Sequence, residues 1–247
     1  MRYLPLNGAD RATMLERIGV ENIDALFCDV PAEARLDGPV DLPIHKSEMQ
    51  VERDMQAMAG QNVTAGSAPF FCGAGAYRHH VPATVDHIIQ RSEFLTSYTP
   101  YQPEITQGTL QYLFEFQSQV AELTGMEVAN ASMYDGSTAA GEAVLMAHRV
   151  TRRNHAVVSG RVHPQYVDVI ANLSDMGGFG LTHIPPTVQG AEDLLSSVDE
   201  NTSCVVVQNP DFFGSVNDYT EVAEAVHARG ALLIVVVTEV VSLGVLK

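Results

Sequence analysis

Lysine is the scarcest of the chemically useful residues in this sequence. Its 247 residues include two lysines, Lys46 near the start and Lys247 at the end, so chemistry that needs a positioned lysine has two candidates. Tryptophan is absent, and Lys and Arg together number 14 against 30 acidic residues, which gives a formal net charge of −16. Such an acidic chain repels nucleic acids and anionic membrane surfaces, so we expect neither as a partner.

The sequence also has few cysteines and no long hydrophobic run. Cys28, Cys72 and Cys204 are odd in number and widely spaced, a pattern that favours reduced thiols over a disulfide framework. The longest apolar run, 231–237, is far shorter than the roughly 20 residues that cross a membrane. The N-terminus lacks the hydrophobic region of a secretory signal, so we expect a cytoplasmic protein with no membrane contact.

The apolar pattern divides the chain into an N-terminal helical segment, 1–65, and a main domain, 66–247. Apolar spacing predicts helices within 11–27 and over 47–59, the second with Ser47 as its N-cap. The residues between these helices contain several prolines and predict an extended connection. We expect the helical segment to lie on the main domain rather than to form a domain of its own.

From residue 155 onward, short β-branched runs alternate with amphipathic helices. The expected strands are 155–159, 181–184, 204–208 and 231–237, and the expected helices are 163–176, 191–198 and 218–229, the last opening with a capping box from Asp218 to Glu221. This alternation predicts right-handed crossovers and an α/β fold with a mostly parallel, doubly wound sheet. Because such a sheet needs cover on both faces and the chain ends soon after the last strand, we expect a C-terminal truncation; the alternative is that 240–247 forms a terminal cap.

We expect the rest of the chain to be arranged around the stretch 98–140. Apolar residues three and four apart predict a helix over 107–124 whose stripe packs on a core, and Gly125 is placed to end it in the left-handed conformation. An irregular segment then leads into a small-residue helix that starts near Thr138. Backbone N–H groups and hydroxyls at a helix start suit a phosphate, here at Asp135, Gly136, Ser137 and Thr138. The same residue types form ordinary helix N-caps, and composition alone favours capping.

A second glycine-rich stretch, 65–77, is followed by His79 and His80. It lacks the strand before it and the helix directly after it that a phosphate loop has. No cysteine or carboxylate lies at metal-ligand spacing from the paired histidines. We therefore expect solvent-facing or hydrogen-bonded histidines rather than a metal site.

Sheets of the predicted kind bind ligands beyond the carboxyl ends of their strands. The segments expected there are 130–138, 161–163, 209–214 and the residues after Val237. Hydroxyls, amides, a histidine that can stack on a ring and an acid after a later strand suit a pyridoxal-phosphate site. A nucleophile elbow, a Walker loop and a Rossmann glycine fingerprint are all absent.

Several longer motifs in this sequence resemble those of one protein family. They are YTPYQPEITQGT (98–109), ELTGM (122–126) and ANASMYDG (129–136) with Thr138-Ala139, together with YLPL (3–6), MLERIG (14–19) and FCDVP (27–31). With these motifs the chain resembles, over essentially its whole length, the P-protein of the glycine cleavage system. The similarity is to the N-terminal subunit of the split form, glycine dehydrogenase (decarboxylating) subunit 1.

The resemblance implies the large domain of a fold-type-I pyridoxal-phosphate-dependent transferase, preceded by the helical segment. It implies a heterotetrameric oxidoreductase of glycine catabolism that decarboxylates glycine and passes the aminomethyl group to the lipoyl arm of H-protein. The two kinds of subunit are homologous, and the cofactor lysine belongs to subunit 2. The family subunit also continues beyond the equivalent of Lys247, in agreement with a truncation.

The lysine count leads to the same expectation about the cofactor. A pyridoxal-phosphate enzyme needs a lysine for its Schiff base and usually an acid on the pyridinium nitrogen. Lys46 precedes the whole sheet, Lys247 follows it too soon to be placed in a pocket, and the strand 231–237 ends in Thr238-Glu239 without the usual aspartate. We therefore expect that this chain forms no Schiff base with the cofactor.

The resemblance places a loop of this chain near the interface with the catalytic subunit, where a phenol or carboxylate orients substrate or cofactor. Its residues are Tyr98, Tyr101, Glu104, Gln107 and Gly108. Equally open is that the tyrosines pack at the interface and that Glu104 is a helix N-terminal acid. His163 is either a ring-stacking remnant or a first-turn residue before Pro164, and 135–138 is then a degenerate phosphate loop.

Two other functions stay open. The chain is a scaffold whose old cofactor pocket is empty and which only holds its partner, or it is a self-sufficient pyridoxal-phosphate enzyme with another substrate. The lysine count disfavours the second alternative. The sequence singles out no catalytic residue in this chain.

Overall fold

The computed structural model describes residues 6–36, 38–189 and 192–244, so Lys247 and most of the motif 3–6 lie outside the described residues. The chain divides into two compact units, Met1–Val63 and Thr64–Lys247. Within the described ranges, no helix is long and apolar enough to cross a membrane.

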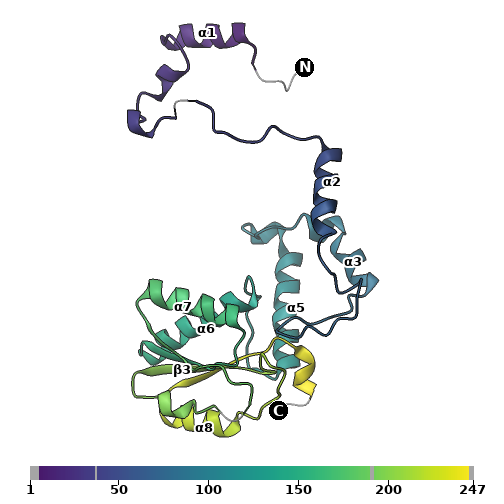
Figure 1. Ribbon diagram of the computed structural model, residues 1–247, viewed down its shortest axis with the longest axis vertical. Coiled ribbons are helices and arrows are strands. Elements are labelled where there is room, and N and C mark those ends of the chain that lie inside the picture. The colour runs from purple at the N-terminus through teal and green to yellow at the C-terminus, as the bar shows by residue number, and fades with distance from the viewer. Residues whose placement is uncertain (1–5, 37, 190–191, 245–247) are drawn as a thin grey trace. The chain divides into compact units, whose positions relative to one another are not determined.

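The first unit contains two capped helices (Figure 1). A capping box between Asn7 and Asp10 opens α1 (Gly8–Ile18), and one between Ser47 and Gln50 opens α2 (Glu48–Ala59). The short turns η1 (Asp24–Phe27) and η2 (Ala32–Ala34) lie between them. The helix predicted before Gly19 and the one predicted over 47–59 are confirmed, whereas only the 3-10 turn η1 forms where a further helix was predicted before residue 27. None of the described residues of this unit is buried, so this part of the chain has no hydrophobic core of its own.

The second unit contains a sheet of four parallel strands in the order β2-β1-β3-β4. The strands are β1 (His155–Val158), β2 (Gly180–His183), β3 (Thr202–Gln208) and β4 (Leu232–Val236), so all the predicted strands are confirmed. The chain moves from β1 outward to β2 and from β3 outward to β4. The switch point of the sheet, where ligands of such folds bind, therefore lies between the carboxyl ends of β1 and β3.

Helices cover both faces of this sheet (Figure 1). The helices α6 (Gly136–Thr151) and α7 (Pro164–Gly177) cover one face, and α8 (Thr220–Ala228) covers the other. The first core contains Val144, Ile170, Val158, Cys204 and Val206, and the second contains Val226, Leu194, Val157, Val205 and Val207. Every residue of β3 is buried, which is the pattern of a central parallel strand. The predicted α/β class with a parallel, doubly wound sheet is confirmed.

Two local predictions in this unit are wrong. Only a short turn, η4 (Leu195–Ser197), forms in the described part of the predicted helix 191–198, and Arg229 donates to the carbonyl of Leu195 at 2.6 Å. The capping box from Asp218 to Glu221 is also absent. Instead, the Asp218 carboxylate accepts the N–H of Thr220 at 2.9 Å, which satisfies the first residue of α8 without a contribution from Glu221.

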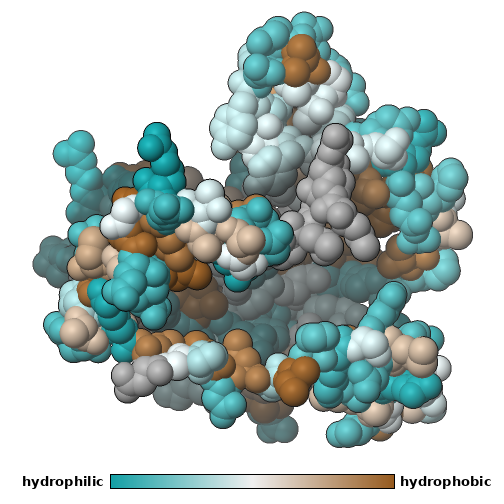
Figure 2. All heavy atoms as spheres, turned by 90° about the horizontal axis from the view of Figure 1, so that it is seen from above, coloured by the Kyte–Doolittle hydropathy of each residue, from teal (hydrophilic) through white to brown (hydrophobic). Residues whose placement is uncertain are grey.

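The helix predicted over 107–124 is confirmed as α5 (Gln107–Thr124), and Gly125 ends it at a φ of 72°. It is preceded by α3 (Ala83–Ile89), α4 (Ser92–Leu95) and η3 (Pro103–Ile105). The predicted stripe is partly confirmed: Leu110, Leu113, Val120 and Ala121 are half-buried, but no residue of α5 is fully buried, and Phe114 and Leu123 are 69% and 67% exposed. Hydrophobic side chains also reach the surface elsewhere (Figure 2). The helices α6, α7 and α8 supply the cores on the two faces of the sheet, and no residue of α5 belongs to either core.

The buried histidine of α6 makes stability depend on pH. His148 is 5% exposed and stacks on Phe179 with ring centroids 4.5 Å apart. Burial lowers the pKa of His148, although the backbone of Arg153 opposes the change. Because the folded pKa lies below the unfolded value of about 6.5, this contribution to stability is complete above that pH and is lost as the pH falls toward the folded pKa.

We expect His148→Leu to remove this acid sensitivity. The unfolding free energy of the wild type should fall more between pH 7.5 and pH 5.5 than that of the variant, as measured by urea unfolding. His183→Gln, at an exposed position, is the matched control and should follow the wild type. Parallel pH profiles for the wild type and His148→Leu would contradict the assignment.

Candidate functional site

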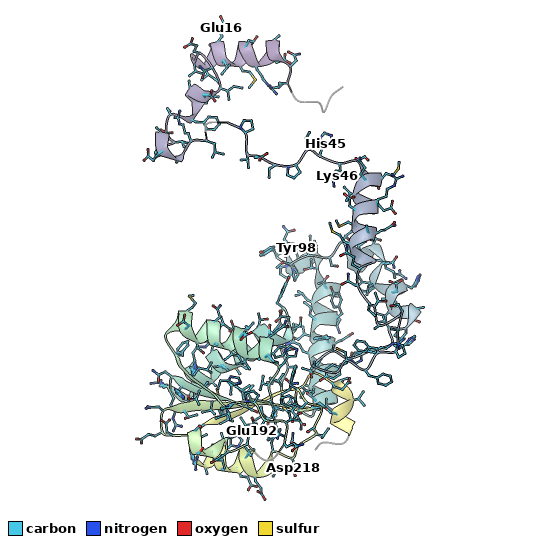
Figure 3. The ribbon with its side chains drawn as sticks, in the orientation of Figure 1. Glu16, His45, Lys46, Tyr98, Glu192 and Asp218 are labelled. Carbon is cyan, nitrogen blue, oxygen red and sulfur yellow. The ribbon has the colours of Figure 1, made fainter. Side chains whose placement is uncertain are left out.

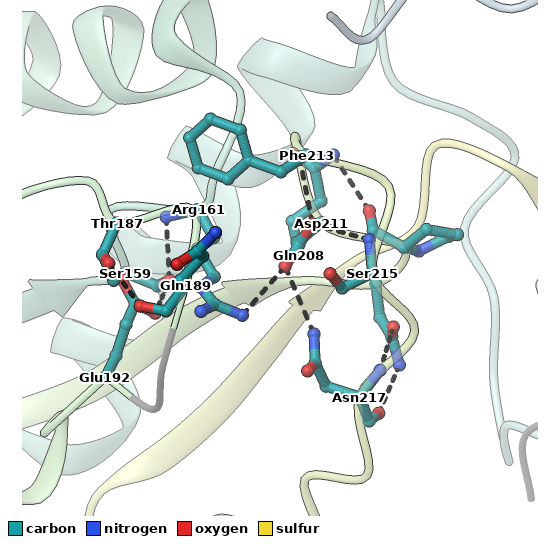
Figure 4. Close-up of polar contacts among 12 residues, drawn as sticks. Ser159, Arg161, Thr187, Gln189, Glu192, Gln208, Asp211, Phe213, Ser215 and Asn217 are labelled. Carbon is teal, nitrogen blue, oxygen red and sulfur yellow. Dashed lines mark hydrogen bonds and ion pairs between the residues drawn. The ribbon is translucent and has the colours of Figure 1, made fainter. Parts of the chain in front are cut away.

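A buried ion pair lies at the switch point of the sheet (Figure 4). Arg161 follows β1 and Asp211 follows β3, and the guanidinium NH1 lies 3.2 Å from Asp211 Oδ2, with the side chains 9% and 0% exposed. Both residues belong to segments that the sequence placed at the carboxyl edge, and this placement is confirmed. An ion pair of the chain itself therefore spans the position between the two strand ends where ligands of such folds bind.

The Asp211 carboxylate has further partners from the loop that follows it. It accepts the N–H groups of Phe213 and Ser215 at 3.0 and 2.9 Å and the side-chain amide of Asn217 at 3.3 Å. Asn209 and Asn217 exchange two more hydrogen bonds, of 2.8 and 3.1 Å. Backbone donors, an amide and a guanidinium thus satisfy both oxygens of the buried carboxylate.

Glu192 closes the other side of this network. Its carboxylate accepts the hydroxyl of Ser159 and, at 2.9 Å, the N–H of Gly160, while Ser159 Oγ accepts the N–H of Arg161 at 3.0 Å. Burial, with smaller effects from Asp211 and Glu192, raises the pKa of Tyr219 to about 12. Sequence reasoning missed Glu192 because it assigned the residue to a helix, and no local motif marks its distant partner.

The predicted phosphate loop is a helix N-cap. Asp135 Oδ1 accepts the N–H of Thr138 at 2.7 Å and the hydroxyls of Ser137 and Thr138, both at 2.8 Å. The hydrogen bond from the Thr138 N–H is the main reason that the pKa of Asp135 is lowered, so this carboxylate is ionised at neutral pH. The helix begins at Gly136, two residues before the predicted start. A negative charge therefore already occupies the end of the helix that attracts anions.

His163 is the N-cap of α7, and its half-buried ring lies against three other parts of the chain. Its Nδ1 accepts the N–H of Gln165 at 3.2 Å, and its ring centroid lies 5.4 Å from that of Tyr166 and 5.2 Å from that of Phe212. A Cβ added at Gly75 would lie 2.2 Å from His163 Cδ2, so the Gly75 backbone lies directly against the imidazole.

Tyr166 lies beside both the N-terminus of α6 and the ring of His163. A Cβ added at Gly136 would lie 2.1 Å from its hydroxyl. Burial, followed by Asp135 and Tyr77, raises the pKa of Tyr166. The tyrosine follows His163 by one helical turn, which is the signal from which its position could have been inferred.

The carboxyl end of β4 also has partners from the segment around Gly75. The Tyr77 hydroxyl lies 3.0 Å from Thr238 Oγ1, and His79 Nε2 lies 3.5 Å from Glu239 Oε2. Among the residues that the structure describes, no group of three His, Cys, Asp or Glu side chains could hold a metal ion.

The remaining predicted residues lie on the chain that leads into α5 (Figure 3). Tyr98 and Tyr101 are 89% and 83% exposed, Glu104 lies in η3, and Gln107 and Gly108 begin α5. None of these residues takes part in the hydrogen bonds given above for the carboxyl edge. The predicted site residues therefore fall into two separate groups, one at the carboxyl edge of the sheet and one in an exposed loop.

Comparison with known proteins decides the family. A family model described as glycine cleavage system P-protein matches residues 1–247. The chain belongs to the P-protein family. The probable glycine dehydrogenase (decarboxylating) subunit 1 of Caulobacter vibrioides is 65% identical over the whole chain, and that of Azorhizobium caulinodans is 67% identical. The chain spans 55% of the length of each of these relatives.

Solved structures agree with this assignment. A crystal structure of glycine decarboxylase (P-protein) in an inhibitor-bound form matches with a TM-score of 0.78 and 44% identity, covering 100% of this chain and 55% of that one. A sphingosine-1-phosphate lyase from Burkholderia pseudomallei matches with a TM-score of 0.59 and 14% identity, covering 83% of this chain and 50% of that one. The second match concerns the fold alone, which is that of the pyridoxal-phosphate-dependent transferases.

Pyridoxal phosphate is the cofactor of this P-protein family, but the residues of this chain do not fit it. Lys46 is paired with Asp54 in the first unit (Figure 3), and the other lysine lies outside the described residues. Asp135 is an anion where the phosphate would bind, and the Gly75 backbone lies against the ring of His163. The end of β4 offers Glu239, which already contacts His79.

Proposed function

We propose that this chain is part of subunit 1 of a two-subunit glycine decarboxylase. The complex decarboxylates glycine with pyridoxal phosphate and transfers the aminomethyl group to the lipoyl arm of H-protein, and the cofactor lysine belongs to subunit 2. The proposal rests on the match of the whole chain to relatives of that name at 65–67% identity. We place the complex in the cytoplasm, without a nucleic-acid or membrane partner.

The surface properties of the second unit support a role at a subunit interface. The stripe of α5 is exposed at Phe114 and Leu123, and the preceding loop exposes Tyr98 and Tyr101. Exposed aromatic side chains of this kind are typical anchors of protein interfaces. We propose that this loop and α5 face subunit 2, with Tyr98, Glu104 and the first turn of α5 closest to its active site.

The test is reconstitution. The chain, and in parallel its full-length form, is co-expressed with subunit 2, and glycine-dependent carbon dioxide exchange is measured with lipoylated H-protein. We expect exchange only when both subunits and H-protein are present. Subunit 2 that exchanges carbon dioxide equally well without the full-length partner would overturn the proposal.

Single substitutions separate a direct role from the scaffold alternative, which the closed carboxyl edge also supports. Loss of one orienting hydrogen bond is worth about 1.5 kcal/mol, so we expect Tyr98→Phe or Glu104→Gln to lower kcat by about tenfold. Subunit assembly, measured by size-exclusion chromatography, should stay unchanged. Tyr134→Phe, at a tyrosine that is 96% exposed, is the matched control. Unchanged kcat in both test variants would favour the scaffold.

A further inference from the structure

The segment Gly73–His79 has a backbone conformation that brings it against His163. Gly73, Ala74 and Gly75 have consecutive positive φ angles of 64°, 52° and 75°, and the N–H of Ala76 donates to the carbonyl of Gly73 at 3.0 Å. Glycine adopts this conformation at little cost, whereas a side chain at position 75 would overlap the imidazole. The tight turn therefore allows backbone to reach the place where a flat ligand would contact His163.

Two side chains fasten the other end of this segment to the sheet. The Tyr77 hydroxyl is bonded to Thr238 at 3.0 Å, and His79 lies 3.5 Å from Glu239. Both partners follow β4 directly. The segment thus reaches from the switch-point side of the sheet, at His163, to the end of its outer strand β4.

Each group that could hold the cofactor consequently has an internal partner. The N-terminus of α6 is capped by Asp135, the ring of His163 is covered by Gly75, and the acid after β4 contacts His79. We propose that Gly73–His79 is an internal strap that occupies the cofactor position of this chain. The strap excludes pyridoxal phosphate by steric occupation, and it does so whether or not the chain works with subunit 2.

The reactivity of His163 toward diethyl pyrocarbonate reports the strap directly. In the full chain, with modification read by peptide mass spectrometry, we expect His163 to react at least about tenfold more slowly than the exposed His80, because its Nδ1 is hydrogen-bonded and its Nε2 side is covered. Equal rates at His163 and His80 would overturn the proposal.

A second experiment uses variants that release the strap from its partners. Tyr77→Phe combined with His79→Ala removes both fastenings, and we expect the rate at His163 to rise about tenfold. Gly75→Val pushes the strap off the ring directly and should have the same effect. Circular dichroism and an unchanged rate at His87 show that the variants are folded.

The matched control is His80→Gln, which changes the neighbouring exposed histidine and should leave His163 protected. Pyridoxamine, which forms no Schiff base with lysine and carries no phosphate for Asp135 to repel, then probes the vacated ring position by equilibrium dialysis. We expect measurable binding in the released variants and none in the wild type. Binding to the wild type, or unchanged reactivity of His163 in all variants, would overturn the strap.

Discussion

Replacing Asp211 by alanine is expected to lower the unfolding free energy by about 3–5 kcal/mol, because the substitution breaks a buried ion pair by removing the carboxylate that faces the Arg161 guanidinium. Arg161 and Asp211 are 9% and 0% exposed at the side chain, so water cannot replace the lost carboxylate. The Asp211 side chain also accepts the N–H groups of Phe213 and Ser215. The substitution therefore releases the loop after β3 as well as the charge.

Urea unfolding of the whole chain at pH 7.5 measures this effect. Glu93→Gln breaks the exposed pair between Arg91 and Glu93 and should leave the unfolding free energy unchanged. The double variant Arg161→Met with Asp211→Leu should be more stable than Asp211→Ala, because it removes both buried charges at once. A loss below about 1 kcal/mol for Asp211→Ala would show that solvent reaches the pair.

The strands could be predicted because a central parallel strand carries its own signal. The run Cys-Val-Val-Val at 204–207 is apolar at every position, which fits β3, buried along its whole length. Helix ends were also readable, since Gly125 and Gly178 both adopt the left-handed conformation that ends a helix. These features depend on neighbours in the sequence, and local pattern was enough to find them.

What the sequence could not provide is the identity of distant partners. The α5 stripe has the spacing of a core helix, but whether it faces a core depends on which surfaces remain uncovered, and here its residues are at most half-buried. Glu192 binds groups 32 and 33 residues away, and the glycine-rich stretch 65–77 showed no sign of reaching His163. Such contacts are set by the crossovers of the fold, so only the three-dimensional arrangement identifies them.

The same arrangement changes the interpretation of the candidate site. Asp135 to Thr138 suited either a phosphate or a cap, and the bonds from Thr138 and Ser137 to Asp135 correspond to the cap. At the switch point, Arg161 and Asp211 satisfy each other. This P-protein chain therefore keeps the architecture of a cofactor site, but its own groups fill the carboxyl edge where a cofactor would bind. The exposed loop is a separate feature, and it is where we place the contact with subunit 2.

Gly160→Ala is expected to be the second severe substitution, with a loss of about 3 kcal/mol of unfolding free energy. A Cβ at this position would lie 2.5 Å from the carbonyl oxygen of Ile184, 2.6 Å from Pro186 Cα and 2.7 Å from the carbonyl carbon of Pro185. All three are backbone atoms, so no side-chain rotation relieves the overlap. The chains that leave β1 and β2 would have to separate.

That separation would also break the network at the switch point, since the N–H of Gly160 donates to Glu192 at 2.9 Å. Gly108→Ala is the matched control: it makes the same change in the first turn of α5, where no atom lies within 4 Å of the added Cβ. Because alanine favours helix over glycine, this control should gain up to about 1 kcal/mol. If urea unfolding finds Gly160→Ala as stable as the wild type, the close approach of the two backbones is wrong. A large loss confined to Gly160→Ala would establish that the carboxyl edge is closed by backbone as well as by charge.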